Sequence, residues 1–451
     1  MTNVLFIAYH FAPLNSGGTF RSLYFVKYLR DFGINPIVLT VDRDSYRKIY
    51  DDFFVDEALL NEIPADTDIR FVPSENILNL YNSPLKAFLN IYFNLHSGSE
   101  SSKWRKKIWP EVEKAVQQFK PKAVFVSVPP FSTMRTGLEI SKKFKLPLIL
   151  DFRDPWLTWR TTPFGSFVHF FLTRIMEEKY IRASDAVITT SDQTILDFIK
   201  FHPDIERKKY HFIPNGYDEK ITDWSIVNRE KKDDTIVIGY VGSFYYDPKA
   251  REQLLSPWYS KKINRILQYT LLREDWLYRS PYFFLKAVKR VLEIRPDLKA
   301  GIKINFIGEV PLWLPGMIGE YGLESSCQLL GKKTRKESVE FQKQCDFLLL
   351  TSSKVLKGDD YSIAGKTFEY FSMRRPILAF VSNGAQKRMI LNSGMGLICN
   401  PDDPQESAQR MIQLFEGKSE LHPNTDFLNS LHRKNLTGKL ARVINKVCGS
   451  Y

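Results

Sequence analysis

The sequence predicts an α/β protein built from two doubly wound, Rossmann-like parallel-sheet domains that face a cleft. First, 451 residues are too many for one ordinary core, because single hydrophobic cores stop growing near ~250–300 residues. Second, short apolar runs alternate with amphipathic helical patterns, as in parallel sheets with helical crossovers. Third, this alternation stops at turn residues 213–218 and the polar stretch 228–234, and then restarts.

The first half contains five apolar runs that we interpret as strands. The run at 4–8 has no polar position, which is typical of a strand buried on both faces. Segments with helical periodicity separate this run from the next ones. We predict strands at 4–8, 36–40, 123–128, 146–151 and 186–190, and helices at 20–32, 108–119, 133–144 and 167–183.

The second half repeats the alternation and carries one irregular segment. Residues 245–282 are rich in Tyr, Trp, Arg and Lys and interrupt a short strand-to-helix connection. Long connections are usually functional or mobile, so we weigh a lid or membrane contact against a passive surface excursion. Strands are predicted at 236–241, 302–307, 327–330, 347–351, 376–380 and 396–399. The predicted domains are 1–218 and 219–425, and a helical segment at 426–451 is expected to pack back on the first domain.

The bulk composition predicts a globular protein with an anionic partner. Apolar residues make up 43% and charged residues 25%, which excludes a disordered chain. The net charge of +13 favours nucleic acid, acidic lipid or a phosphorylated substrate. The sequence lacks the basic and aromatic pattern of an RNA-binding sheet and the Cys/His spacing of a zinc finger. We therefore expect no nucleic-acid partner.

The cysteines and the N-terminus predict a cytoplasmic protein. The four cysteines show no short paired spacing and resemble buried thiols of a reducing compartment. The first apolar run begins too early to leave room for a signal peptide. No run reaches the ~18–20 apolar residues that span a bilayer. Any membrane contact should be peripheral, on the inner face of the cell membrane. The cysteines are Cys327, Cys345, Cys399 and Cys448.

Candidate site residues of the first half follow its predicted strands, because open parallel sheets bind ligands at the carboxyl ends of their strands. Gly17 and Gly18 precede a helix and would let backbone N–H groups approach a phosphate; the alternative is a tight turn. Asp151, Arg153 and Asp154 suit a hydroxylated acceptor, and the alternative is a self-satisfied ion-pair network. Ser127 ends another strand, and His10 follows the first one.

Candidate site residues of the second half include a strand end and a helix start. Gly242 and Ser243 close the strand at 236–241. Residues 359–371 lead from small residues into a helix whose first amides, together with Lys366, could hold a diphosphate. Glu369 is placed to accept hydrogen bonds from ribose hydroxyls; the alternative is a capped helix with an exposed Glu. The sequence lacks G-x-G-x-x-G, which counts against an NAD or FAD enzyme.

Taken together, the sequence resembles glycosyltransferase family 4, over nearly its whole length. Four stretches carry the resemblance: the first strand with its Pro and Gly-Gly loop, and residues 151–156, 213–218 and 365–370. The last is similar to the variant in bacterial surface-polysaccharide transferases. The resemblance implies a GT-B fold and a retaining, metal-independent enzyme without a cofactor, in which residues 1–218 serve the acceptor and residues 219–425 bind a UDP- or GDP-linked sugar.

The resemblance also implies residue roles. Glu369 would contact the donor ribose, and the first amides of the helix would face the diphosphate. Tyr361 stands where the family has its first glutamate, and Ser127 where many members have a histidine. The family's cationic pair after Gly242 has three candidates here, Lys249, Arg251 and Lys286. The residues implied at the diphosphate are Gly365, Lys366 and Thr367, with Gly17 and Gly18 on the opposite side, and those implied at the nucleobase are Gly331 and Lys332.

The predicted function is transfer of a sugar to a saccharide or lipid-linked acceptor, in cell-surface polysaccharide or glycolipid biosynthesis. A nucleotide-sugar epimerase and a non-catalytic donor-binding protein are the alternatives. An aromatic and basic stretch could rest on an anionic bilayer and admit a lipid-linked acceptor, or could be a core helix with a basic outer face. Its aromatic residues are Phe88, Tyr92, Trp104 and Trp109, among Lys86, Lys103, Arg105, Lys106 and Lys107.

Overall fold

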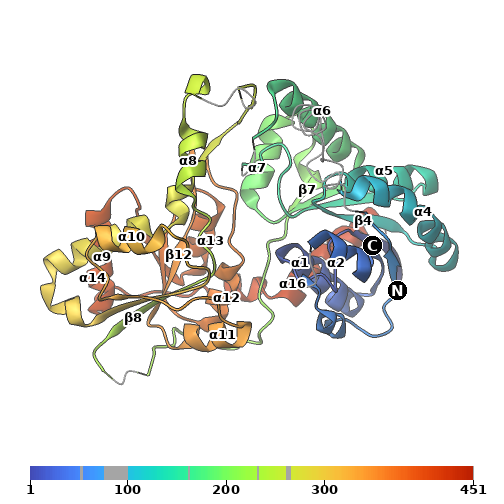
Figure 1. The fold of residues 1–451 in the computed structure, drawn as a ribbon. Coiled ribbons are helices and arrows are strands. Elements are labelled where there is room, and N and C mark those ends of the chain that lie inside the picture. Colours follow the sequence, from blue (N-terminus) through green and yellow to red (C-terminus); the bar gives the residue numbers. More distant parts are fainter. Residues whose placement is uncertain (51–53, 76–99, 161–162, 231–232, 261–265, 450–451) are drawn as a thin grey trace. The chain divides into compact units, whose positions relative to one another are not determined.

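The computed structural model describes residues 1–50, 54–75, 100–160, 163–230, 233–260 and 266–449. The chain divides into two compact units (Figure 1). The first comprises Met1–Gly216, Ile263–Leu271 and Arg433–Tyr451, and the second comprises Tyr217–Lys262 and Leu272–His432. Phe88 and Tyr92 of the aromatic and basic stretch lie outside the described residues.

The first unit contains a parallel sheet of seven strands in the order β3-β2-β1-β4-β5-β6-β7. Every residue of β4 is buried, as expected of a strand covered on both faces. The chain runs outward from β1 in one direction and from β4 in the other, so the topological switch point lies between them. The strands are β1 (Thr2–Ala8), β2 (Ile34–Val41), β3 (Ile69–Val72), β4 (Ala123–Val128), β5 (Leu148–Phe152), β6 (Ala186–Thr189) and β7 (Tyr210–Phe212).

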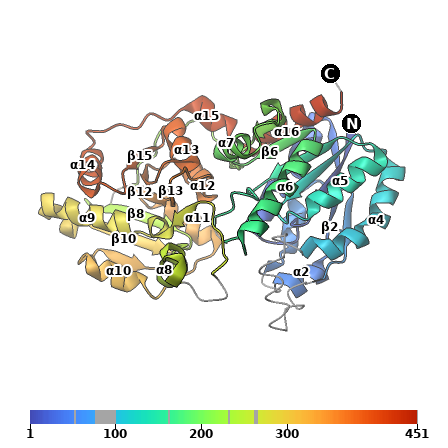
Figure 2. The ribbon, with the colours of Figure 1, turned by 90° about the horizontal axis from the view of Figure 1, so that it is seen from above.

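Helices cover both faces of this sheet. Figure 2 shows α4, α5 and α6 side by side over one face. Helix α16, near the C-terminus, packs against α1 and adds Leu436, Leu440 and Ile444 to a core that includes Phe6 and Val26. The helices of this unit are α1 (Gly17–Leu29), α2 (Arg43–Tyr50), α4 (Glu100–Phe119), α5 (Thr133–Phe144), α6 (Phe167–Ala183), α7 (Asp192–Phe201) and α16 (Arg433–Val447).

Helix α4 bears on the two interpretations of the aromatic and basic stretch. The side chain of Trp104 is fully buried, and its indole N–H donates to the carbonyl of Val72 at 3.2 Å. Trp109 packs, partly buried, against the same core. The apolar positions of α4 therefore serve the core of the first unit, as the alternative interpretation held.

The second unit contains a parallel sheet of six strands in the order β11-β10-β8-β12-β14-β15. Its switch point lies between β8 and β12. The strands are β8 (Ile236–Val241), β10 (Ile302–Ile307), β11 (Cys327–Leu329), β12 (Phe347–Thr351), β14 (Ile377–Phe380) and β15 (Gly396–Cys399), and the helices are α8 (Pro248–Leu255), α9 (Tyr282–Ile294), α10 (Leu314–Glu320), α11 (Arg335–Lys343), α12 (Lys366–Met373), α13 (Ala385–Ser393), α14 (Pro404–Phe415) and α15 (Thr425–Ser430).

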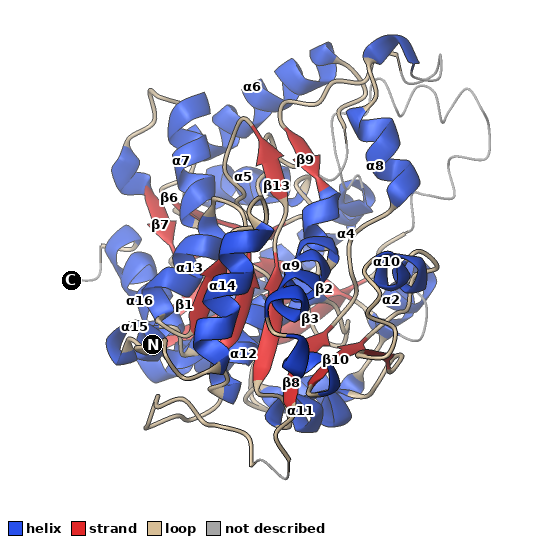
Figure 3. Ribbon diagram, turned by 90° about the vertical axis from the view of Figure 1, so that its left-hand side faces the viewer, coloured by secondary structure: helices blue, strands red, loops and turns tan. Residues whose placement is uncertain are grey.

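The irregular segment 245–282 is partly structured. It contains α8 and the strand β9 (Arg273–Asp275), which pairs antiparallel with β13 (Lys354–Leu356), as Figure 3 shows. Between α8 and β9 lies Ile263–Leu271, which belongs to the first unit. Within the described part of the chain, no helix has the length and apolarity needed to cross a bilayer.

Candidate functional site

Three glycines lie at the carboxyl ends of neighbouring strands in the second unit. Gly242, Gly308 and Gly331 follow β8, β10 and β11, and all three have positive φ angles of +119°, +145° and +67°. A Cβ atom on Gly308 would collide with the carbonyl of Gly242, so a side chain is excluded there. The glycines leave the edge of the sheet near the switch point without side chains, and backbone groups can approach a ligand there.

Lys366 fills part of this space. It begins α12, and a Cβ atom on Gly242 would lie 2.8 Å from its Nζ atom. The ammonium group lies 3.7 Å from the ring centre of Tyr240. Burial lowers the pKa of Lys366 to about 7, and the Glu369 carboxylate partly opposes this shift. An anion bound beside Lys366 would stabilise the charged form, so the position is suited to a phosphate group.

The turn before α13 holds the loop that leads into α12. The N–H of Ala385 donates to the carbonyl of Asp360 at 2.8 Å, and a Cβ atom on Gly384 would collide with the backbone of Asp360. The side-chain carbonyl of Gln386 accepts from the N–H of Ala364 at 2.8 Å and from the hydroxyl of Thr367 at 3.0 Å. The hydroxyl of the buried Thr367 thus supports the helix start.

The remaining residues around α12 differ in accessibility. Gly365 is exposed and would meet no atom within 4 Å if it carried a Cβ, so the first turn of α12 is open to a ligand. Glu369 is partly exposed, and its carboxylate accepts a hydrogen bond from the fully buried Gln342 of α11. This bond orients the carboxylate. Tyr361, at the position of the family's first glutamate, is buried.

Arg279 is a cation of this region that the sequence did not single out. Its guanidinium pairs with the buried Glu274 at 2.9 Å and donates to the hydroxyls of Ser353 and, at 3.2 Å, Ser362. It lies 5.8 Å from the ring centre of Tyr245. Arg279 therefore lies beside the 359–365 loop. Its signal in the sequence is weak, because it lies at the end of the irregular segment, 87 positions before Lys366.

The three cations predicted from the sequence lie on α8 and α9. Arg251 pairs with Asp275 through two hydrogen bonds of 2.5 and 2.8 Å. Lys249 and Lys286 are exposed on α8 and α9. Ser243 is exposed after β8, and Lys332 is exposed after β11, 3.7 Å from Glu309.

His10 and Arg153 form a second cluster, in the first unit. The Nη2 atom of Arg153 lies 3.1 Å from Nδ1 of His10, and Nε2 of His10 lies 2.7 Å from the hydroxyl of Tyr50. Burial and the Arg153 guanidinium lower the pKa of His10 to about 3, so the imidazole is neutral. Because a guanidinium can only donate, the histidine proton lies on Nε2 and points to Tyr50.

The glycines before α1 have two different environments. Arg153 donates to the carbonyl of Gly18, and a Cβ atom on Gly18 would collide with the guanidinium. Gly17 is exposed, with open space around it. Gly18 thus accommodates Arg153, whereas the space beside Gly17 is open to a ligand. Asp154 is partly exposed and interacts electrostatically with Arg153.

Asp151 is fully buried and forms an ion pair. Arg21 contacts its carboxylate through Nη2 at 2.7 Å and through Nε at 3.0 Å, and the hydroxyl of Ser127 lies 3.4 Å away. Arg21 also donates to the carbonyl of Pro214 at 3.2 Å. The sequence left open a self-satisfied ion-pair network of Asp151, Arg153 and Asp154, and the structure instead pairs Asp151 with Arg21.

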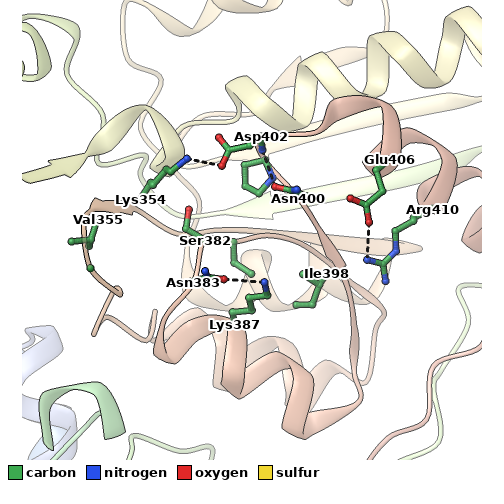
Figure 4. A pocket seen from close by; sticks show the side chains of 13 residues that line it. Lys354, Val355, Ser382, Asn383, Lys387, Ile398, Asn400, Asp402, Glu406 and Arg410 are labelled. Carbon is green, nitrogen blue, oxygen red and sulfur yellow. Dashed lines mark hydrogen bonds and ion pairs between the residues drawn. The ribbon is translucent and has the colours of Figure 1, made fainter. Parts of the chain in front are cut away.

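A polar cavity of about 440 Å³ lies at the carboxyl ends of β14 and β15 in the second unit (Figure 4). The cations that line it are paired with oxygen atoms: Lys354 with Asp402 at 2.6 Å, Lys387 with Asn383 at 3.0 Å and Arg410 with Glu406 at 3.8 Å. The lining residues include no predicted donor-site residue. Across the described residues, no cluster of three or more His, Cys, Asp or Glu could hold a metal ion.

A family model matches part of the second unit. Residues 276–417 match the model of the family described as "Glycosyl transferases group 1". This range contains Arg279, Lys366 and Glu369. No significant match was found among the curated proteins.

Solved structures share the fold over the full chain. Sucrose-phosphate synthase from Thermosynechococcus elongatus is 11% identical, with 100% of both chains covered and a TM-score of 0.61. The lipopolysaccharide outer core galactosyltransferase WaaB, in its apo form, is 13% identical, with 99% of both chains covered and a TM-score of 0.59. HepE from Anabaena, in complex with UDP and glucose, is 14% identical, with 100% of this chain and 98% of that chain covered and a TM-score of 0.51.

Epimerases of UDP-N-acetylglucosamine are also among the similar structures. At these identities the likeness shows the fold, which confirms the predicted class of two Rossmann-like parallel-sheet domains. Residues 276–417 of the second unit thus match a model of group 1 glycosyltransferases, and the two-domain fold is shared with glycosyltransferases of known structure.

Proposed function

We propose that the protein transfers a sugar from a UDP- or GDP-linked donor to a hydroxyl of a saccharide or lipid-linked acceptor. One observation carries the proposal: the Lys366 ammonium lies at the start of α12, against the glycine-lined end of β8, with a pKa lowered to about 7. A diphosphate would supply the missing counter-charge. The family match over residues 276–417 and the UDP in the HepE structure support a nucleotide-sugar donor.

The donor would be held by groups of the second unit. Lys366, Arg279 and the open N–H of Gly365 would contact the diphosphate, because cations and helix N-termini stabilise phosphate charge. Glu369, oriented by Gln342, would accept hydrogen bonds from the ribose hydroxyls. Gly331 and Lys332 would lie at the nucleobase. We assign the acceptor side to the first unit, with His10 and Arg153 as its polar groups.

The reaction exchanges one bond to the anomeric carbon of the sugar for another. The bond to the diphosphate oxygen breaks, a bond to the acceptor oxygen forms, and the acceptor proton passes to the departing phosphate if the configuration is retained. Lys366 and Arg279 would stabilise the developing negative charge. We propose that this transfer is retaining and needs neither metal nor cofactor.

The cellular setting follows from the same chemistry. A net charge of +13 favours an anionic membrane surface, and the galactosyltransferase WaaB, of similar fold, acts on lipopolysaccharide by its name. We propose a cytoplasmic protein in cell-surface polysaccharide or glycolipid biosynthesis, held peripherally at the inner face of the membrane.

The donor can be identified by thermal unfolding with a panel of UDP-, GDP- and ADP-sugars. A ligand at a hundred times its Kd should add ~2.7 kcal/mol of stability. We expect one nucleotide class to stabilise the protein and Glu369→Ala to abolish this effect. Glu340→Ala, an exposed glutamate of α11, is the matched control. An undiminished effect in Glu369→Ala would refute the ribose assignment.

Product analysis separates the alternatives. A transferase releases nucleoside diphosphate only with an acceptor, whereas an epimerase converts its donor without one. Two observations make this test necessary. Tyr361 stands in place of a glutamate, and epimerases are among the similar structures. Donor binding without any turnover would indicate a non-catalytic protein.

A further inference from the structure

Helix α6 of the first unit carries apolar side chains on its solvent face. Residues at spacings i, i+1, i+4, i+5 and i+8 form one continuous stripe of a helix. The opposite face, with Phe170 and Ile181, is buried against the unit. The stripe consists of Phe167, Val168, Phe171, Leu172 and Ile175, with 58%, 63%, 49%, 37% and 48% of their surfaces exposed.

A separate segment extends this stripe. The N–H and C=O groups of Phe164 and Tyr269 exchange hydrogen bonds of 2.9 and 3.0 Å. The Tyr269 ring packs on Phe167 at 5.2 Å and on Phe170 at 4.8 Å. Ile266 and Leu267, just before Tyr269, are 42% and 61% exposed. We call the α6 stripe together with Ile266 and Leu267 the α6 surface.

The size of the α6 surface distinguishes it from scattered surface residues. Seven large apolar side chains expose several hundred Å² in one region, which is typical of interaction sites rather than of free protein surface. Neither face of α6 is polar over its first turns, so the core alone does not explain the sequence of the helix.

The charges around the α6 surface indicate the kind of partner. Residues 163–176 and 263–272 contain no Asp or Glu. Glu177 faces inward, where it accepts from the N–H of Leu157 at 2.8 Å and lies 2.9 Å from His202. Glu178 pairs with Arg182 at 2.7 Å, and Lys179 is exposed at the end of the stripe. The surface is therefore apolar, with Lys179 as an exposed cation at its end and no acidic residue in its own segments.

We propose that the α6 surface docks on an anionic lipid bilayer, with the apolar stripe at the headgroup boundary and Lys179 among the lipid phosphates. This inference rests on the peripheral membrane contact of the proposed function, to which it assigns a site, and it is independent of the sugar chemistry. It relocates the contact from the α4 region, where Trp104 is buried. A lipid-linked acceptor would be presented at such a surface.

Co-sedimentation of the full chain with vesicles tests the proposal. The vesicles contain phosphatidylcholine alone or with phosphatidylglycerol. We expect binding to the anionic vesicles, at least about tenfold weaker binding for Phe171→Glu/Ile175→Glu, and a smaller loss for Lys179→Ala. Leu312→Glu/Leu391→Glu adds the same charges at side chains that are 101% and 59% exposed in the second unit, and it should bind like the wild type.

Three results would overturn the proposal. The wild type could fail to bind anionic vesicles, or the α6 variant could bind as well as its control. The α6 variant could also turn a dimer into a monomer on gel filtration without any vesicle binding, which would identify a contact between copies of the chain. Stabilisation by the nucleotide sugar reports on folding and on the donor site independently. If Phe171→Glu/Ile175→Glu is unfolded, Phe171→Ser replaces it, with the same expected direction.

Discussion

At the scale of single residues, the ionisation of Lys366 decides how donor binding depends on pH. The free ammonium has a pKa of about 7, because its environment disfavours the charge. A bound diphosphate raises this pKa, so binding takes up a proton once the pH exceeds 7. The protonated form, which predominates below pH 7, is the one that binds.

We therefore expect the donor Kd to be constant below about pH 7 and to rise above it, by at most about tenfold per pH unit. Isothermal titration between pH 6 and 9 measures this. Lys366→Arg should flatten the profile, because an arginine stays charged throughout this range. Lys303→Ala, an exposed lysine on β10, should leave the profile unchanged. An unaltered slope in Lys366→Arg would place the titrating group elsewhere.

The buried pair between Arg21 and Asp151 gives a second prediction at this scale. Asp151→Asn leaves a buried guanidinium without its counter-charge, which typically costs ~3–5 kcal/mol. Glu113→Gln breaks the pair with Lys143, in which both side chains are about half exposed, and should cost at most ~1 kcal/mol. Urea unfolding compares the two variants. If Asp151 instead acts on the acceptor, the variant should lose turnover with its stability intact.

At the scale of elements, the turn before α13 positions the start of α12. Gly384 has a φ of +143° and lies against the backbone of Asp360. Gly384→Ala should push the 359–365 loop away from α13, destabilise the protein by ~1–3 kcal/mol and weaken donor binding. Gly417 is the matched control, because it also has a positive φ, of +68°, but a Cβ atom there would meet no atom within 4 Å.

Gly417→Ala should therefore lower the free energy of unfolding only through the strain of an alanine at positive φ. It should leave donor affinity unchanged. Thermal unfolding and titration with the donor, on both variants, separate the two effects. Equal donor affinities for the two variants would mean that the loop does not depend on this turn.

At the scale of the whole molecule, the chain contributes to the first unit three times: up to Gly216, again at Ile263–Leu271, and finally through α16. Leu440 is fully buried among α1 and β1 residues. Leu440→Ala should lower the free energy of unfolding of the first unit by ~2–5 kcal/mol and leave donor binding by the second unit intact. Leu391→Ala, at a 59% exposed position, is the control. Loss of donor binding in Leu440→Ala would mean that the two units fold as one.

Elements with a strong local pattern were predicted closely. The strand at 123–128 and the helices at 133–144 and 167–183 agree with β4, α5 and α6 in both bounds. The sequence did not predict β3 and β7, which are short edge strands with charged or polar positions, or the β9–β13 pair. Such strands form because a neighbour offers unpaired backbone groups, and nothing in their own residues requires it.

Local periodicity and loop composition were enough to predict the two parallel sheets, because these signals depend on neighbouring residues. They also predicted the strand ends at Gly242 and Gly331 and the Gly-Lys start of α12. Contacts between distant residues were decided only by the folded chain: the pairing of Arg21 with Asp151 across 130 positions, the place of Arg279 beside Ser362, and the side of α6 that faces solvent. A helix that carries apolar residues on both faces over its first turns does not encode there which face is buried, and an ion pair depends on where the backbone brings two side chains together.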